Sequence, residues 1–254
     1  MGFVLNCSGR DNTLITLSKG FRCTVPELKM VLLDIDLEKV FTADPHIPKT
    51  ANQLLFEYTI NNLTEPDELI SAFWFHGTRT VADNHFPDGI LPLNRSFAAV
   101  IRMLADAAPS SQVRTRLSDW EKSGVPDRMF MERHGNSIHW GPYASLIREA
   151  QLNNEVTGHR NYTKMPELVE DVCNAYMKQY GSDIKAHYAA ILKPKLIWFS
   201  APPNDSRRCI EAALAYAYTT VRHQPPDSCA NWGIDREGVA VPPENIIRDR
   251  KSVV

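Results

Sequence analysis

Long apolar runs are absent from this sequence of 254 residues. No window approaches the roughly 18 apolar residues that a membrane-spanning helix needs. Residues 1–10 also lack the charged stretch followed by an apolar run that marks a secretory signal. We therefore expect a cytoplasmic, unprocessed protein without a membrane partner.

The sequence also lacks a charge excess of either sign and has few cysteines. Its formal net charge is −2, which argues against the general basic field of a dedicated duplex-binding protein but leaves room for a local basic patch. The five cysteines are widely spread, and no two are spaced Cys-x-x-Cys. This pattern predicts reduced thiols, with neither a zinc site nor a disulfide framework.

Several motifs of common enzyme classes are missing. The sequence has no Gly-x-Ser-x-Gly elbow, no P-loop and no Gly-x-Gly-x-x-Gly, which argues against a serine hydrolase, a P-loop NTPase and a Rossmann dehydrogenase. His134 and His139 are five residues apart, without cysteine or acidic partners at metal spacing. We therefore predict exposed histidines there and no metal.

The composition is that of an ordinary folded protein, with 43% hydrophobic and 23% charged residues. The length predicts a single catalytic domain over residues 1–254, with N-terminal strands or an extension in 1–60 and a helical insertion at 96–138. Strands and helices follow one another without a regular βαβ repeat. The expected fold class is therefore α+β.

Apolar periodicity, prolines, glycines and capping residues predict the individual elements. An aromatic strand at 71–75 would deliver His76 to a glycine turn, and Tyr143 would stand at the N-terminal edge of a helix. Residues 36–50 are predicted to be a connector. The predicted helices are 64–70, 97–107, 111–122, 144–152, 166–179 and 206–221. The predicted strands are 13–17, 29–35, 71–75, 188–192, 195–200 and a terminal strand of 238–241 and 245–248 that is interrupted by Pro242-Pro243.

Three segments carry the chemistry that the sequence suggests. The first is Phe75-His76-Gly77-Thr78-Arg79-Thr80, followed by Asp88-Gly89-Ile90-Leu91-Pro92; the second is Gly141-Pro142-Tyr143; the third runs from Glu237 through Pro242-Pro243 to Ile246. The first two resemble motifs of the poly(ADP-ribose) polymerase-like branch of the ADP-ribosyltransferases. The third is similar to the glutamate-strand-Pro-Pro-x-Asn-Ile ending of bacterial ADP-ribosyltransferase toxins.

The resemblance implies a split mixed or antiparallel sheet and NAD bound as a substrate, without a metal. His76 would bond the adenosine ribose, the Gly77 backbone would hold the nicotinamide carboxamide, and Tyr143 would stack on the nicotinamide ring. A carboxylate at Glu237 would bond the ribose 2′-hydroxyl and stabilise the developing cation. Thr78 and Arg79 would complete the NAD-binding segment.

Each assignment has a plainer structural alternative. A histidine after an aromatic strand is often only a capped loop residue, and a lone tyrosine is more often a core residue. Glu211 and Glu244 compete with Glu237 for the catalytic role. Arg79 would contact a phosphate or only pair with a surface acid.

The leading functional hypothesis is mono-ADP-ribosylation of a macromolecular acceptor by a bacterial toxin or phage-defence effector, with an antitoxin protein as a possible partner. Residues 95–133 carry a slight excess of basic side chains, which favours RNA or DNA over protein as the acceptor. One alternative is an NAD glycohydrolase or an NAD-dependent RNA 2′-phosphotransferase. Another is an inactive NAD-binding module, which requires that Glu237 does not face the site.

Overall fold

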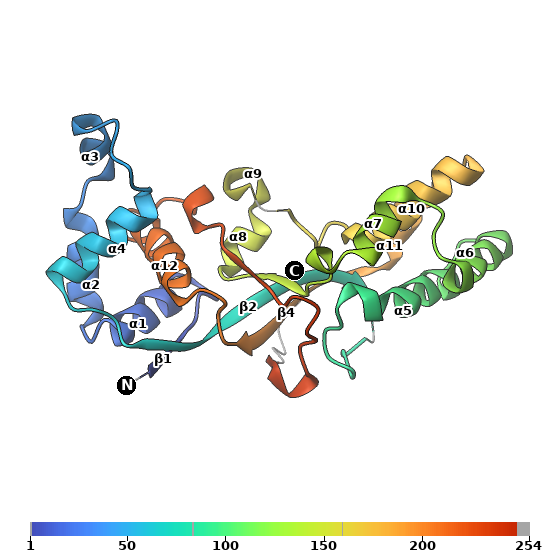
Figure 1. Ribbon diagram of the computed structural model, residues 1–254, viewed down its shortest axis with the longest axis horizontal. Helices are drawn as coiled ribbons and strands as arrows, with labels where there is room; N and C mark the ends of the chain where they lie inside the picture. The colour runs from blue at the N-terminus through green and yellow to red at the C-terminus, as the bar shows by residue number, and fades with distance from the viewer. Residues whose placement is uncertain (1, 83, 159, 248–254) are drawn as a thin grey trace. The chain divides into compact units, whose positions relative to one another are not determined.

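The computed structural model describes residues 2–82, 84–158 and 160–247 (Figure 1). The chain divides into two compact units, and the single catalytic domain over residues 1–254 stays a prediction. Unit 1 contains the described residues up to Phe75, Ala144–Arg160 and Phe199–Ile234. Unit 2 contains His76–Tyr143, Asn161–Trp198 and the described residues from Asp235 onwards. Each unit buries its own set of apolar side chains.

Six strands form one sheet, in the order β5-β3-β2-β4-β6, with β1 beside β2. β1 pairs with β2 in parallel, whereas β3 runs antiparallel to β2, with Phe75 opposite Ser145. The α+β class is therefore confirmed, while the specific ADP-ribosyltransferase sheet stays a prediction. The strands are β1 (Gly2–Leu5), β2 (Glu68–Thr80), β3 (Tyr143–Ser145), β4 (Lys193–Ala201), β5 (Gly233–Asp235) and β6 (Ile246–Ile247).

The aromatic strand predicted at 71–75 is the centre of β2, where Trp74 and Phe75 are fully buried. β2 continues through His76 and Gly77 to Thr80, so the glycine turn expected after Phe75 is wrong. Bulky and β-branched side chains on both sides of Gly77 favour the extended chain, because they fit a pleated surface. His76 is thus held on a regular strand.

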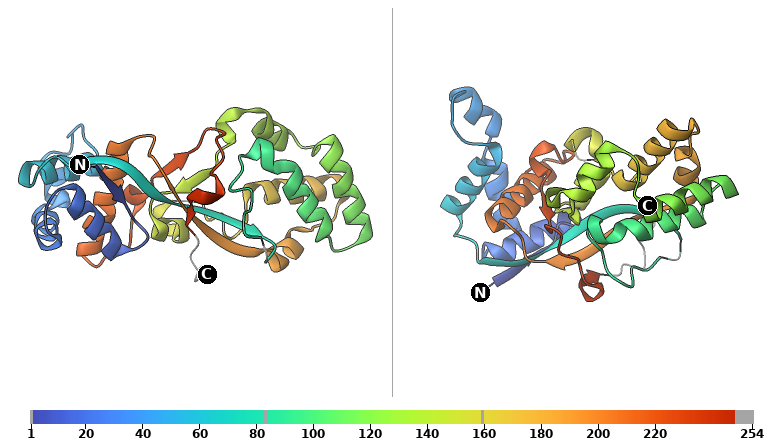
Figure 2. Two further views of the ribbon diagram at one scale, coloured as in Figure 1. Left: turned by 90° about the horizontal axis from the view of Figure 1, so that it is seen from below. Right: turned by 45° about the vertical axis from the view of Figure 1, so that its right-hand side comes forward.

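Unit 1 is built around α12 (Ser206–Val221), as predicted from its helical composition. Figures 1 and 2 show this helix beside three helices from the N-terminal part of the chain, and all three contact it. Asp205, rather than Ser206, caps the helix by accepting from the Arg208 backbone N–H. The other helices of unit 1 are α1 (Arg10–Gly20), α2 (Val25–Asp34), α3 (Leu37–Ala43), α4 (Ala51–Asn62), α8 (Arg148–Leu152), α9 (Asn154–Thr157) and the 3₁₀ turn η2 (Ser228–Ala230).

The N-terminal strands predicted at 13–17 and 29–35 are wrong, because these residues lie in α1 and α2. Thr24 and Glu27 form a reciprocal capping box at the start of α2. Leu28 and Leu32, which are four residues apart, are both fully buried, as expected on one face of a helix. The predicted connector at 36–50 contains α3, capped by Asp36.

Unit 2 contains a mainly helical core that includes the predicted insertion at 96–138. Its helices bury Trp120 and Tyr176 with a cluster of aliphatic side chains, and Trp120 stacks on Tyr180 with 5.9 Å between ring centroids. The elements are α5 (Leu93–Asp106), α6 (Ser111–Ser123), α7 (Arg128–Gly135), η1 (Ser137–His139), α10 (Glu167–Tyr180), α11 (Lys185–Ile191) and η3 (Pro243–Asn245).

Four more predicted elements differ from the structure. Residues 188–191 belong to α11 rather than a strand, and β2 begins at Glu68 inside the predicted helix at 64–70. Tyr143 lies in β3, and the helix expected at 144–152 begins only at Arg148. Of the predicted terminal strand, residues 238–241 form no strand, although Val241 bridges to Ile90, whereas β6 lies within the second part at 245–248, of which Arg248 is outside the described residues. Among the residues that the structure describes, no helix has the length and apolar character to cross a membrane.

Candidate functional site

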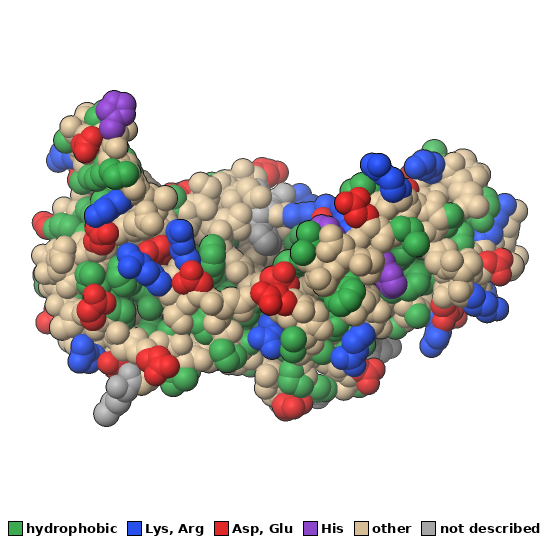
Figure 3. Space-filling view, viewed as in Figure 1, with side chains coloured by type: hydrophobic (Ala, Val, Ile, Leu, Met, Phe, Trp, Pro, Cys, Tyr) green, Lys and Arg blue, Asp and Glu red, His purple; other side chains and the backbone are tan. Residues whose placement is uncertain are grey.

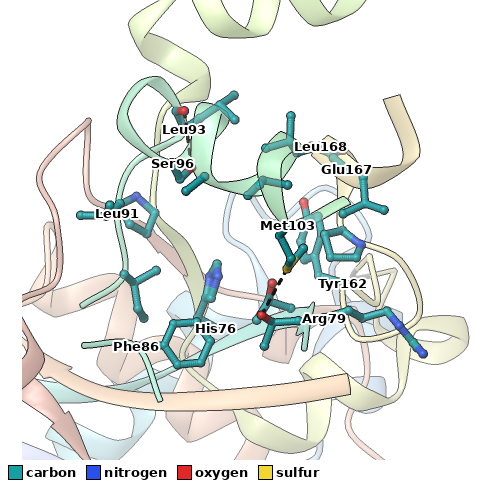
Figure 4. A pocket seen from close by; sticks show the side chains of 18 of the residues that line it. His76, Arg79, Phe86, Leu91, Leu93, Ser96, Met103, Tyr162, Glu167 and Leu168 are labelled. Carbon is teal, nitrogen blue, oxygen red and sulfur yellow. Dashed lines mark hydrogen bonds between the residues drawn. The ribbon is translucent and has the colours of Figure 1, made fainter. Parts of the chain in front are cut away.

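Unit 2 contains a cavity of about 600 Å³ (Figure 4). Its walls come from the end of β2, the loop that follows it, α5, the segment before β3 and the first turns of α10. Most of the lining is apolar or aromatic, including Phe86, Met103, Trp140 and Tyr162. A mainly apolar cavity of this size, with a few polar groups, is typical of a small-molecule or cofactor site.

His76 points from β2 into this cavity (Figure 4). Its Nδ1 lies 2.7 Å from the Tyr143 carbonyl oxygen, and because a carbonyl only accepts, Nδ1 carries the proton. Burial lowers the pKa of His76, and the hydrogen bond to the Tyr143 carbonyl opposes this shift only in part. The ring is therefore neutral near pH 7, which leaves Nε2 as a hydrogen-bond acceptor.

Tyr143 brings an aromatic ring to the same cavity from β3. Its hydroxyl donates to the Ile138 carbonyl, and the residue is 41% exposed. Partial burial raises the pKa of Tyr143 to about 12, and the nearby Asp235 carboxylate adds to the shift. The phenol thus stays protonated at neutral pH, and the ring can offer a face to a planar ligand.

The three motif segments meet in unit 2 through backbone hydrogen bonds. Gly238 N–H donates to the Gly141 carbonyl at 2.7 Å, just before Tyr143 in the chain. Ile90 and Val241 exchange two hydrogen bonds, each of 2.9 Å. At Gly89, with φ +77°, a Cβ would lie only 2.0 Å from the Val241 oxygen, so glycine is required for this approach.

Glu237 does not line the cavity, and neither does any other residue of the third motif segment. It lies in an exposed turn with φ +51°, where its N–H donates to the Asp235 carboxylate at 2.8 Å. Its two competitors do not line the cavity either: Glu244 is exposed in η3. Glu211 is buried in unit 1, 2.9 Å from Arg207. The structure therefore brings His76 and Tyr143 together and leaves the predicted catalytic glutamate outside.

The rest of the predicted NAD-binding segment divides in two. Gly77 and Thr78 line the cavity beside His76. The guanidinium of Arg79, by contrast, points away from His76 (Figure 4). It donates to four backbone carbonyls, those of Thr163, Lys164, Ala189 and Leu192, at 2.6–3.3 Å. These backbone carbonyls hold the guanidinium, while Arg79 also lines the cavity. The two roles expected for Arg79, a phosphate contact or an ion pair with a surface acid, stay predictions.

Three charged residues of the cavity were missed by sequence analysis. Arg133 of α7 lies 2.6 Å from the Asp171 carboxylate and 3.8 Å from the Glu167 carboxylate, both of α10. Burial raises the pKa of Asp171, against the opposing effect of Arg133. Only the apolar face of α10 carried a sequence signal, so its acids gave no indication of a site. The described part of the chain has no group of three or more His, Cys, Asp or Glu side chains placed to hold a metal.

Comparison of the chain with protein families, with curated proteins and with solved structures finds no match. The resemblance to the ADP-ribosyltransferases therefore rests on the sequence motifs alone.

Proposed function

We propose that the protein binds NAD in the unit 2 cavity and transfers its ADP-ribose to a macromolecular acceptor. The observation that carries this proposal is the convergence of His76 and Tyr143. They are 67 residues apart in sequence, yet a 2.7 Å hydrogen bond joins them in a cavity that also contains Gly77 and Thr78. The residues that the resemblance assigned to NAD thus all line one cavity, although the Arg79 guanidinium points away from His76.

The chemistry assigns a task to each of these groups. Nε2 of neutral His76 would accept a hydrogen bond from a ribose hydroxyl, and the Tyr143 ring would pack on the nicotinamide. The bond from C1′ to the nicotinamide nitrogen would break heterolytically, so the electron pair leaves with neutral nicotinamide and positive charge develops on the ribosyl group. A lone pair of the acceptor would then bond to C1′, and the acceptor's proton would pass to solvent.

The acceptor class stays open between nucleic acid and protein. Four basic residues of the 95–133 segment have internal partners: Arg102 bonds Glu121, Arg114 bonds two carbonyls, Arg116 bonds Tyr176 and Arg133 bonds Asp171. On the face drawn in Figure 3, basic and acidic side chains are interspersed. The basic side chains of residues 95–133 therefore offer little free positive surface to a nucleic-acid phosphate. The role as a toxin and the antitoxin partner stay proposals.

A second candidate, an NAD-binding module without turnover, is favoured by one observation. Glu237 is exposed and does not line the cavity, as this candidate requires. Both candidates predict NAD binding, and only the transferase predicts release of nicotinamide.

The test incubates the purified protein with NAD labelled in the adenylate and with separate pools of RNA, DNA and cell protein. His76→Ala is the test variant, and Glu170→Gln is the control, because Glu170 lies on α10 but outside the cavity lining. We expect label in one pool with wild type and the control, and a loss of at least tenfold with His76→Ala. Free ADP-ribose alone would identify a glycohydrolase, bound but intact NAD would identify the module, and no NAD binding by folded wild type would refute the proposal.

A further inference from the structure

We propose that Glu167, rather than Glu237, is the catalytic carboxylate that faces the ribosyl cation. This inference rests on the proposed function, because it names the residue that would stabilise charge during NAD cleavage. It starts from a mismatch in the structure. The cavity that contains His76 and Tyr143 is not lined by the glutamate expected from the motif, yet it is lined by other acids.

The lining contains three carboxylates, those of Asp88, Glu167 and Asp171. Asp171 is bound by Arg133 at 2.6 Å, and its side chain is only 14% exposed. Asp88 lies on the exposed loop before Gly89. Glu167 is both accessible and held in place. Its side chain is 37% exposed, and its carboxylate lies 3.8 Å from the Arg133 guanidinium. An acid that must meet a ligand needs this combination.

The place of Glu167 in the fold also brings its side chain to the aromatic groups of the cavity. It is the first residue of α10 and lines the cavity together with Tyr143 and Tyr162. Its carboxylate contributes to the raised pKa of Tyr143, after burial and the Asp235 carboxylate, and Asp235 does not line the cavity. A nicotinamide ring packed on Tyr143 would thus bring the adjoining ribose within reach of the Glu167 charge.

The assigned role is electrostatic and needs no covalent intermediate. As the C1′–nitrogen bond breaks and the electron pair departs with nicotinamide, positive charge spreads over C1′ and the ring oxygen of ribose. The Glu167 carboxylate would stabilise this positive charge. It would form no covalent bond and gain no proton. Such an interaction is stronger in the transition state than in bound NAD, so its loss should reduce turnover more than affinity.

The test compares Glu167→Gln, Glu167→Asp, Glu237→Gln and the control Glu170→Gln in the full chain. NAD affinity is measured by titration, nicotinamide release by chromatography and folding by thermal unfolding. We expect Glu167→Gln to bind NAD within about threefold of wild type while its release rate falls by about a hundredfold or more. Glu167→Asp should regain part of the rate, and the two other variants should match wild type.

Two results would overturn the inference in distinguishable ways. If Glu237→Gln loses turnover while Glu167→Gln retains it, Glu167 is not the catalytic acid and the proposed function survives. If folded wild type neither binds nor cleaves NAD, the proposed function and the inference fail together. Should Glu167→Gln fail to fold, Glu167→Asp decides the matter, because unchanged turnover with that shorter acid would also contradict the assigned geometry.

Discussion

At the scale of single residues, the state of His76 determines what the cavity can bind. The Tyr143 carbonyl fixes the proton on Nδ1, at 2.7 Å, and burial keeps the ring neutral. A neutral ring with this tautomer presents Nε2 as an acceptor, so it favours a hydroxyl donor over an anionic group. This is the contact that the proposed function assigns to a ribose hydroxyl.

The lowered pKa of His76 predicts an acid-sensitive contribution to stability. Below the ordinary value of 6.5 the unfolded chain takes up a proton that the folded ring resists, so the folded state is penalised as pH falls. His76→Gln removes this penalty. Urea unfolding of both proteins from pH 7.5 to 5 should show that wild type loses more stability on acidification than the variant. Parallel pH profiles would contradict a neutral histidine at this position.

Part of the site can be predicted from sequence at this scale. His76, Gly77 and Tyr143 follow from short motifs, because local spacing fixes how a strand presents neighbouring side chains. Glu167 and Arg133 cannot be predicted in this way, since they come from different helices and have no shared spacing. The motif at Glu237 likewise does not determine where the side chain lies. Its motif is present, but Glu237 and Gly238 both adopt positive φ, and the resulting turn leaves the side chain exposed.

At the scale of elements, the sequence predicts the long helices best. The predicted bounds of α6, α10 and α12 nearly match the observed ones, because the amino-acid composition changes at both ends of each helix. α1 and α2 were mistaken for strands, since short apolar runs fit both periods and the capping box at Thr24 was not recognised. Strand pairings such as that of Phe75 with Ser145 cannot be predicted from the local sequence.

The bridge between Ile90 and Val241 makes a sharp prediction about Gly89. Gly89→Ala combines a left-handed backbone with a clash against the Val241 oxygen at 2.0 Å. Gly181→Ala is the matched control, because Gly181 has φ +68° and open space around it. We expect the control to lose about 1–2 kcal/mol of unfolding free energy, and Gly89→Ala to lose at least about 1 kcal/mol more. Equal losses in chemical denaturation would contradict this contact.

The carbonyl cluster around Arg79 predicts a structural rather than a ligand-binding role. Lysine cannot reach four carbonyls that the planar guanidinium reaches together, so Arg79→Lys should lower the unfolding free energy by about 2–3 kcal/mol. Arg114→Lys is the control, because Arg114 makes only two bonds of 3.3 Å. A variant with unchanged stability and weakened NAD binding would instead restore the phosphate role.

At the scale of the whole molecule, every residue that lines the cavity belongs to unit 2. A ligand that binds only in this cavity stabilises the folded state of unit 2, by about 2.7 kcal/mol when the free ligand concentration is a hundred times its Kd. Hydrogen exchange with and without NAD should therefore show added protection in residues 76–143 and 161–198, and little change in α1 to α4. Protection confined to unit 1 would place the ligand elsewhere.

The central claim is that the cavity beside His76 and Tyr143 binds NAD, and calorimetric titration tests it most directly. We predict one NAD per chain for wild type, the same affinity for Glu170→Gln, and an affinity at least tenfold lower for His76→Ala, with thermal unfolding to confirm that each protein is folded. No binding by folded wild type, or equal affinity with and without the His76 ring, would contradict the account.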